Sequence, residues 1–253
     1  MTRLHGTKDF WLGALRVDGP AFAAAAAQVP PDAPVPSCPG WTITNLIHHL
    51  GGVYEWVSQV VERGGTERPE PRRDPTDAPT GDAALAWWQM RYDSLHSVLE
   101  AADPESPVWN WAPQPKKIGF WQRRMAHETA VHRWDAQMTF AAGEPVEAKL
   151  AADGISEVLD SWLPAGRRKS EERPHGVVQL RAADVEQDWL VRLRGEGVAL
   201  LDTGTILDTD EPPARVHAEG TASDLLLALW GRVGFDVLVV SGDASLLTAL
   251  RAG

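Results

Sequence analysis

The amino-acid sequence changes character at residues 164–176, PAGRRKSEERPHG, a polar and charged stretch bounded by prolines. Long segments of helix-favouring composition precede it. Short segments with alternating or β-branched apolar residues follow it, separated by glycine, aspartate and proline. A stretch of this composition is typical of a linker between domains. We therefore expect a helical bundle over residues 1–163, a linker at 164–176 and a small α+β domain over 177–253.

Five helices are expected in the first region. Prolines and Gly-rich loops interrupt the helix-favouring segments and set their ends, and either Thr42 or Thr44 can cap the second helix. The expected helices span residues 8–28, from the capping threonine to 63, 82–102, 120–142 and 146–163.

The second region alternates strand and helix signals. A helix in SDLLLALWGR is expected to begin at Ser223 as its cap, and a last helix in ASLLTAL at Asp243. The expected strands span residues 177–183, 188–194, 197–202, 214–220 and 236–242.

Composition excludes several classes of function. No apolar run approaches the roughly 18 residues needed to cross a bilayer, so no membrane association is expected. Acidic residues outnumber basic ones 35 to 24, an excess that would repel a phosphate backbone, so nucleic acid is not an expected partner. The amino terminus lacks the features of a secretory signal, and a single cysteine, Cys38, cannot form an internal disulfide. We therefore expect a cytoplasmic protein.

The motif MAHETAVHRWDA indicates a metal site. Glu128 and His132 are four residues apart on the expected helix and therefore share a face. On the expected second helix His49 falls on the apolar stripe, whereas the adjacent His48 points toward water. Two histidines and one glutamate form the ligand set of a catalytic zinc ion, which leaves a coordination position open.

Other interpretations of these residues remain open. Glu128 and His132 could form an ordinary hydrogen-bonded pair, with His49 a satisfied core histidine. Asp135 could hold the His132 ring through its second nitrogen, as carboxylates beside metal-ligating histidines often do, or it could lie on the helix surface. Cys38, just before the expected second helix, is either a nucleophile or a small, partly buried side chain.

Four segments together resemble the mycothiol-dependent maleylpyruvate isomerase family of actinobacteria: SCPGWTITNLIHHLGGVYEW, FWQRRMAHETAVHRWDAQ, GTASDLLLALWGR and VVSGDASLL. The resemblance implies a DinB-like four-helix bundle followed by a sterol-carrier-like α+β domain. It also implies that His49, Glu128 and His132 hold a divalent metal, usually zinc.

The resemblance further implies a small electrophilic substrate and mycothiol, a sugar-linked cysteine thiol, as cosubstrate. Its thiolate would add to the cis double bond of maleylpyruvate, allow rotation and leave again. Arg232 is the candidate cation for the substrate carboxylates, although a solvated arginine at a helix end is the alternative. A mycothiol S-transferase and a non-catalytic, metal-stabilised binding protein are the competing functions.

Overall fold

The computed structural model describes residues 6–73, 75, 78–141, 143–201 and 214–252. The chain forms two compact units. The first comprises Met1–Asn110 and Pro115–Glu144, and the second comprises Trp111–Gln114 and Pro145–Gly253. The expected order, a helical bundle followed by a small α+β domain, is confirmed.

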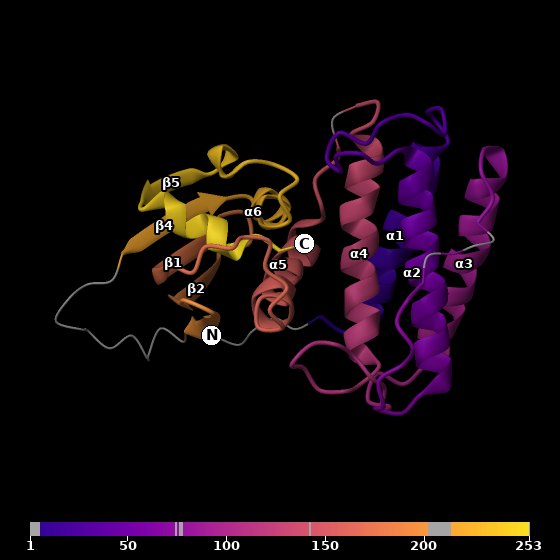
Figure 1. Cartoon of the computed structure of the whole chain (residues 1–253), viewed down its shortest axis with the longest axis horizontal. Coiled ribbons are helices and arrows are strands. Elements are labelled where there is room, and N and C mark those ends of the chain that lie inside the picture. The colour runs from indigo at the N-terminus through magenta and orange to yellow at the C-terminus, as the bar shows by residue number, and fades with distance from the viewer. Residues whose placement is uncertain (1–5, 74, 76–77, 142, 202–213, 253) are drawn as a thin grey trace. The chain divides into compact units, whose positions relative to one another are not determined.

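The first unit is a bundle of four long helices (Figure 1): α1 (Lys8–Ala26), α2 (Ile43–Arg63), α3 (Asp82–Ala101) and α4 (Gly119–Gln137). Helix α1 packs mainly on α4, and α2 packs on both α3 and α4. Large apolar side chains fill the space between the helices, among them Trp88, Trp121, Tyr54 and Phe22, all fully buried. Helix α4 ends at Gln137, before the predicted end at residue 142, which lies outside the described residues.

Helix α2 starts at a capping box. The Thr42 hydroxyl accepts a hydrogen bond from the Asn45 backbone N–H, and the Asn45 side chain accepts one from the Thr42 N–H. Of the two candidate caps, Thr42 is therefore the one that operates. Thr44 instead donates its hydroxyl to the Pro31 carbonyl oxygen and ties the preceding proline-rich loop to the helix.

The boundary between the units falls between Glu144 and Pro145, and not at residue 163 as predicted. The predicted fifth helix, observed as α5 (Ala148–Glu157) with a π-helical turn η1 (Val158–Trp162), packs against α6 (Ala222–Leu229) of the second unit. An amphipathic helix at this place in the chain can bury its apolar stripe against the bundle or against the second unit. The sequence pattern alone does not distinguish the two.

The segment at 164–176 is also part of the second unit and not a free linker. The Lys169 N–H donates to the Arg251 carbonyl oxygen at 3.0 Å, and Arg168 Nη1 donates to the Gly195 carbonyl oxygen at 3.1 Å. Groups of this polar segment thus form hydrogen bonds with backbone carbonyl oxygens elsewhere in the second unit, although its composition is typical of a linker.

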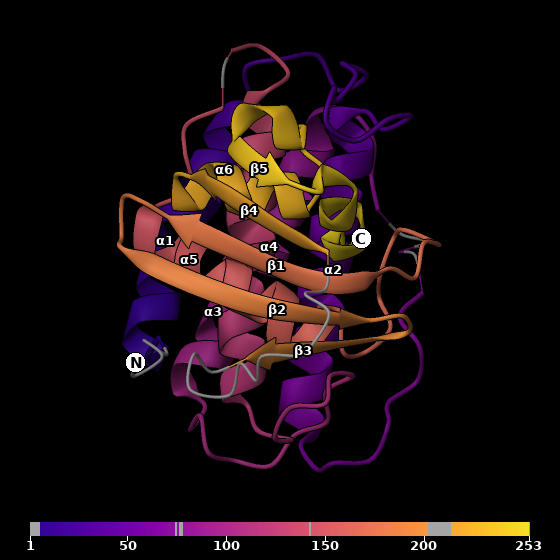
Figure 2. The ribbon, with the colours of Figure 1, turned by 90° about the vertical axis from the view of Figure 1, so that its left-hand side faces the viewer.

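The second unit contains a five-stranded mixed sheet (Figure 2) in the order β3-β2-β1-β4-β5. Strands β1 and β4 pair in parallel and the other neighbours are antiparallel. Val178 and Leu180 of β1 lie opposite Val191 and Trp189 of β2, and all four are buried. The strands span β1 (His175–Ala182), β2 (Gln187–Arg194), β3 (Gly197–Leu201), β4 (Arg215–Gly220) and β5 (Val239–Gly242), close to the predicted segments.

The caps in this unit are partly as predicted. Asp243 caps the last helix, η4 (Ala244–Leu250), which is a 3₁₀ helix. Helix α6 is capped by Thr221, and not by Ser223 as predicted. Ser223 is buried, and its hydroxyl accepts the Val146 N–H at 3.0 Å, so the residue serves a tertiary contact. Among the described helices, none is long and apolar enough to cross a membrane.

Candidate metal centre

Three side chains predicted from the sequence meet between α2 and α4. His49 Nε2 lies 3.0 Å from Glu128 Oε1, and His132 Nε2 lies 3.4 Å from the same oxygen. One donor atom from each residue lies within 4.8 Å of the other two. The i,i+4 spacing on α4 brings Glu128 and His132 into contact. His49 lies on α2, about 80 residues earlier in the chain.

Asp135 lies behind this cluster and is fully buried. His132 Nδ1 lies 2.9 Å from Asp135 Oδ2, so the ring donates this hydrogen bond and turns Nε2 toward Glu128. Ser37 donates its hydroxyl to Asp135 Oδ1 at 2.6 Å, and the Cys38 thiol lies 3.5 Å from Oδ2. Of the two interpretations of Asp135, the structure shows the one in which it holds the histidine ring.

The contacts of Cys38 bear on its two interpretations. Its side chain is half-buried, and its sulfur faces a carboxylate that the His132 ring and Ser37 also contact. The geometry thus favours Cys38 as a small side chain that completes the surroundings of Asp135.

Arg124 is a site residue that sequence reasoning missed. It is buried, lies one turn before Glu128 on α4, and forms an ion pair with Glu128 Oε2. The i,i+4 spacing of Arg124 and Glu128 was a signal that could have revealed the pair. Because Arg124 takes one carboxylate oxygen, the other oxygen faces the two histidines.

The electrostatics of the cluster favour an ionised Glu128 beside a neutral His49. Burial opposes the charged form of Glu128, but Arg124 and the hydrogen bonds from both histidines outweigh it and hold the pKa of Glu128 well below its usual value. Burial lowers the pKa of His49, in spite of its hydrogen bond to Glu128. Burial also acts to lower the pKa of His132, but its hydrogen bonds to Asp135 and Glu128 prevail and raise it.

The cluster opens onto a cavity of about 440 Å³. His49 lines this cavity and is about one quarter exposed, whereas His132 and Glu128 lie deeper. The Trp41 ring, whose centroid lies 5.0 Å from that of His49 and 6.5 Å from that of His132, forms part of the wall. The remaining lining residues are Gly40, Asn45, His48, Arg72 and Pro75.

These residues fit a divalent metal ion. They offer two imidazole nitrogens and a carboxylate oxygen, with the outer nitrogen of His132 bound to a carboxylate, as is usual for metal-ligating histidines. Three donors beside a cavity leave room for a further ligand, which is the arrangement of catalytic and not of closed structural sites.

Two other predicted or nearby residues lie outside the cluster. His48, expected to face water, hydrogen bonds through Nε2 with the Pro79 carbonyl oxygen at 2.7 Å and lines the cavity. Arg232 follows α6 in the second unit, where its Nη1 donates to the Trp230 carbonyl oxygen at 3.1 Å.

Comparison with known families agrees with this architecture. The model of the mycothiol maleylpyruvate isomerase N-terminal domain matches residues 12–137, and that of the maleylpyruvate isomerase (MDMPI) C-terminal domain matches residues 149–249. The chain belongs to the mycothiol-dependent maleylpyruvate isomerase family. The resemblance noted in the sequence is thereby confirmed. The residues matched by the N-terminal domain model include His49, Glu128, His132 and Asp135. Arg232 lies among the residues matched by the C-terminal domain model.

Solved structures share the fold of this family member. A crystal structure of a mycothiol-dependent maleylpyruvate isomerase matches with a TM-score of 0.65 and 13% sequence identity, covering 93% of each chain. A histidine-to-alanine mutant of such an isomerase matches with a TM-score of 0.64, again at 13% identity and 93% coverage of each chain. No protein with a curated description matches the sequence. At this identity the solved structures establish the fold alone.

Proposed function

We propose that this protein is a divalent-metal-dependent enzyme that uses mycothiol as cosubstrate and isomerises a small cis-unsaturated acid of the maleylpyruvate type. One observation carries the proposal: His49, Glu128 and His132 converge, and His49 lines a cavity large enough for a small substrate. Family membership supports the thiol and the reaction class. We further propose a cytoplasmic location, in keeping with the single cysteine.

The residues of the cluster have distinct roles in this proposal. His49, Glu128 and His132 would hold the ion, for which zinc suits two imidazoles and a carboxylate best. When bound, the ion supplies positive charge that lowers the pKa of a thiol at the open position. Asp135 keeps the proton of His132 on Nδ1, which leaves Nε2 as a donor atom. Trp41 packs beside both histidine rings.

The reaction needs a thiolate nucleophile and a cation for the substrate carboxylates. Mycothiol thiolate adds to one carbon of the cis double bond, the resulting single bond rotates, and the thiolate leaves to give the trans product, so the thiol is regenerated. Arg72 lines the cavity and is suited to attract a carboxylate there. Arg232 is proposed as a second cation for the developing enolate.

The test is metal analysis combined with turnover. Purified protein loaded with zinc is expected to convert maleylpyruvate to fumarylpyruvate only when mycothiol is present, as followed by absorbance. Arg232→Gln should lower kcat without loss of metal, whereas Arg192→Gln, on the sheet strand β2, serves as control. Conjugation of a generic electrophile without isomerisation would instead favour the S-transferase alternative. Metal binding without any response to mycothiol would favour a non-catalytic binding protein and contradict the proposal.

A further inference from the structure

A second hollow adjoins the cavity at the metal centre. It has a volume of about 610 Å³ and lies along α2, where Gly52, Trp56 and Arg63 line it. Arg72 and Pro75 line both the hollow and the cavity at His49, so the two spaces meet at these residues. Gly52 and Arg63 are about 16 Å apart along the helix, at a rise of about 1.5 Å per residue. The hollow therefore extends along α2 by about this length, away from the metal centre. We call this second hollow the α2 groove.

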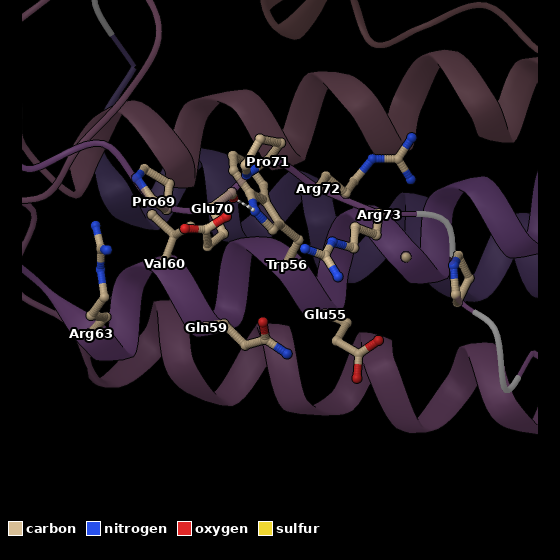
Figure 3. A pocket seen from close by; sticks show the side chains of 12 residues that line it. Glu55, Trp56, Gln59, Val60, Arg63, Pro69, Glu70, Pro71, Arg72 and Arg73 are labelled. Carbon is tan, nitrogen blue, oxygen red and sulfur yellow. Dashed lines mark hydrogen bonds between the residues drawn. The ribbon is translucent and has the colours of Figure 1, made fainter.

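Trp56 is the aromatic centre of the α2 groove. Figure 3 shows the chain from Pro69 to Arg73 running alongside α2, with the Trp56 side chain between them. The indole Nε1 donates to the Glu70 carbonyl oxygen at 3.1 Å, and the ring meets Trp109 and Trp121 edge to face, with centroids 6.1 and 5.5 Å away. Its orientation is therefore fixed before any ligand arrives, which reduces the entropy lost on binding.

The polar lining of the groove combines hydrogen-bond donors with acceptors. Gln59 is exposed on α2, and Glu55 forms an ion pair with Arg91 of α3 at 3.3 Å. The charged lining residues carry both signs; they are Arg63, Arg72, Arg73, Glu55 and Glu70. A site for a small dicarboxylate would be expected to lack the two glutamates, because like charges repel.

We propose that the α2 groove binds the carbohydrate portion of the thiol cosubstrate while its sulfur occupies the cavity at His49. This inference rests on the proposed function, because it assumes a sugar-linked thiol. Neutral hydroxyl groups both donate and accept hydrogen bonds, which matches the mixed lining, and the apolar face of a sugar ring packs on an indole. The continuity of the two spaces at Arg72 and Pro75 allows one ligand to occupy both.

Calorimetric titration of the zinc-loaded protein tests the proposal. The ligands are mycothiol, N-acetylcysteine, which has the thiol but no sugar, and the carbohydrate portion without cysteine. Trp56→Ala is expected to weaken mycothiol binding about tenfold, and Gln59→Ala about threefold, with N-acetylcysteine affinity unchanged within about twofold. Trp56→Phe should retain most of the affinity, because it keeps an aromatic face. The sugar portion alone should compete with mycothiol.

Gln89→Ala is the matched control for Gln59→Ala. It changes an exposed glutamine on α3 that does not line the groove, and it should leave every affinity unchanged. If both thiols bind and the Trp56 and Gln59 variants weaken neither selectively, the groove assignment is wrong while the proposed function stands. Loss of maleate affinity in Trp56→Ala and Gln59→Ala, with mycothiol affinity unchanged, would assign the groove to the acid substrate and overturn the inference. If no thiol binds the wild-type protein, the proposed function fails as well.

Discussion

His132 donates a 2.9 Å hydrogen bond from Nδ1 to the buried carboxylate of Asp135, which fixes the ring so that Nε2 faces Glu128. The same carboxylate also accepts a hydrogen bond from the Ser37 hydroxyl on the loop before α2. A single buried aspartate thus connects the loop before α2 with the end of α4. The position of this aspartate, three residues after His132 on the same helix, makes the contact a local one.

Asp135→Asn is expected to weaken metal binding about 10- to 100-fold, because an amide holds the required tautomer of His132 less well than a carboxylate. Competition with a chromophoric chelator measures the affinity. Ser37→Ala, which removes one partner of Asp135, should have a smaller effect in the same direction. Equal affinity of Asp135→Asn and wild type would show that the carboxylate does not position the ring.

Removal of either histidine of the cluster is expected to abolish metal retention. The wild-type protein should carry about one divalent ion per chain after dialysis, whereas His49→Ala and His132→Ala should carry almost none, because two donors hold an ion far less tightly than three. Elemental analysis by mass spectrometry gives the ratio. His96→Ala, on α3 and outside the cluster, is the matched control. Full occupancy in both cluster variants would falsify the assignment.

Arg124→Leu is expected to destabilise the metal-free protein by about 3 kcal/mol, because it leaves Glu128 as a buried charge without its guanidinium partner. Added zinc should offset part of this loss, since a cation would again face the carboxylate. Urea denaturation with and without zinc measures both effects. The idea is contradicted if zinc stabilises Arg124→Leu no more than it stabilises the wild type.

Gly51 allows the close approach of α2 and α3. A Cβ atom at this position would lie 2.2 Å from the Trp87 ring, so Gly51→Ala should destabilise the bundle by about 1–3 kcal/mol. Gly13→Ala on α1 is the matched control, because no atom lies within 4 Å of its added Cβ. This substitution should stabilise the helix by about 0.5–1 kcal/mol. Thermal melting should therefore shift in opposite directions for the two variants.

The two tyrosines are expected to resist ionisation in the folded protein. Burial raises the pKa of Tyr92 to about 12 and that of Tyr54 well above 10.0. A phenol whose pKa is raised by folding contributes stability that is complete below its unfolded value of 10.0 and is lost as the pH rises through its folded value. Near pH 10.0, where tyrosines of an unfolded chain ionise, ultraviolet absorbance should detect tyrosinate only when circular dichroism shows unfolding. Tyrosinate in a folded chain at pH 10 would contradict this.

The helical and strand segments, the change of fold class along the chain and the local pair Glu128–His132 could all be predicted from the amino-acid sequence. Periodicity and spacing within one element are local properties, so they are readable without the fold. Helical phase also separated His49 from His48, although His48 proved to line the cavity.

The packing partners of these elements could not be predicted and became known from the folded structure. In the folded chain His49 contacts Glu128 of α4, and α5 belongs to the second unit. Ser223 contacts Val146 and does not cap α6. The α2 groove meets the cavity at Arg72. Such contacts join residues far apart in the chain, and many pairings would bury similar apolar stripes. The choice among them depends on side-chain packing, which no local sequence pattern specifies.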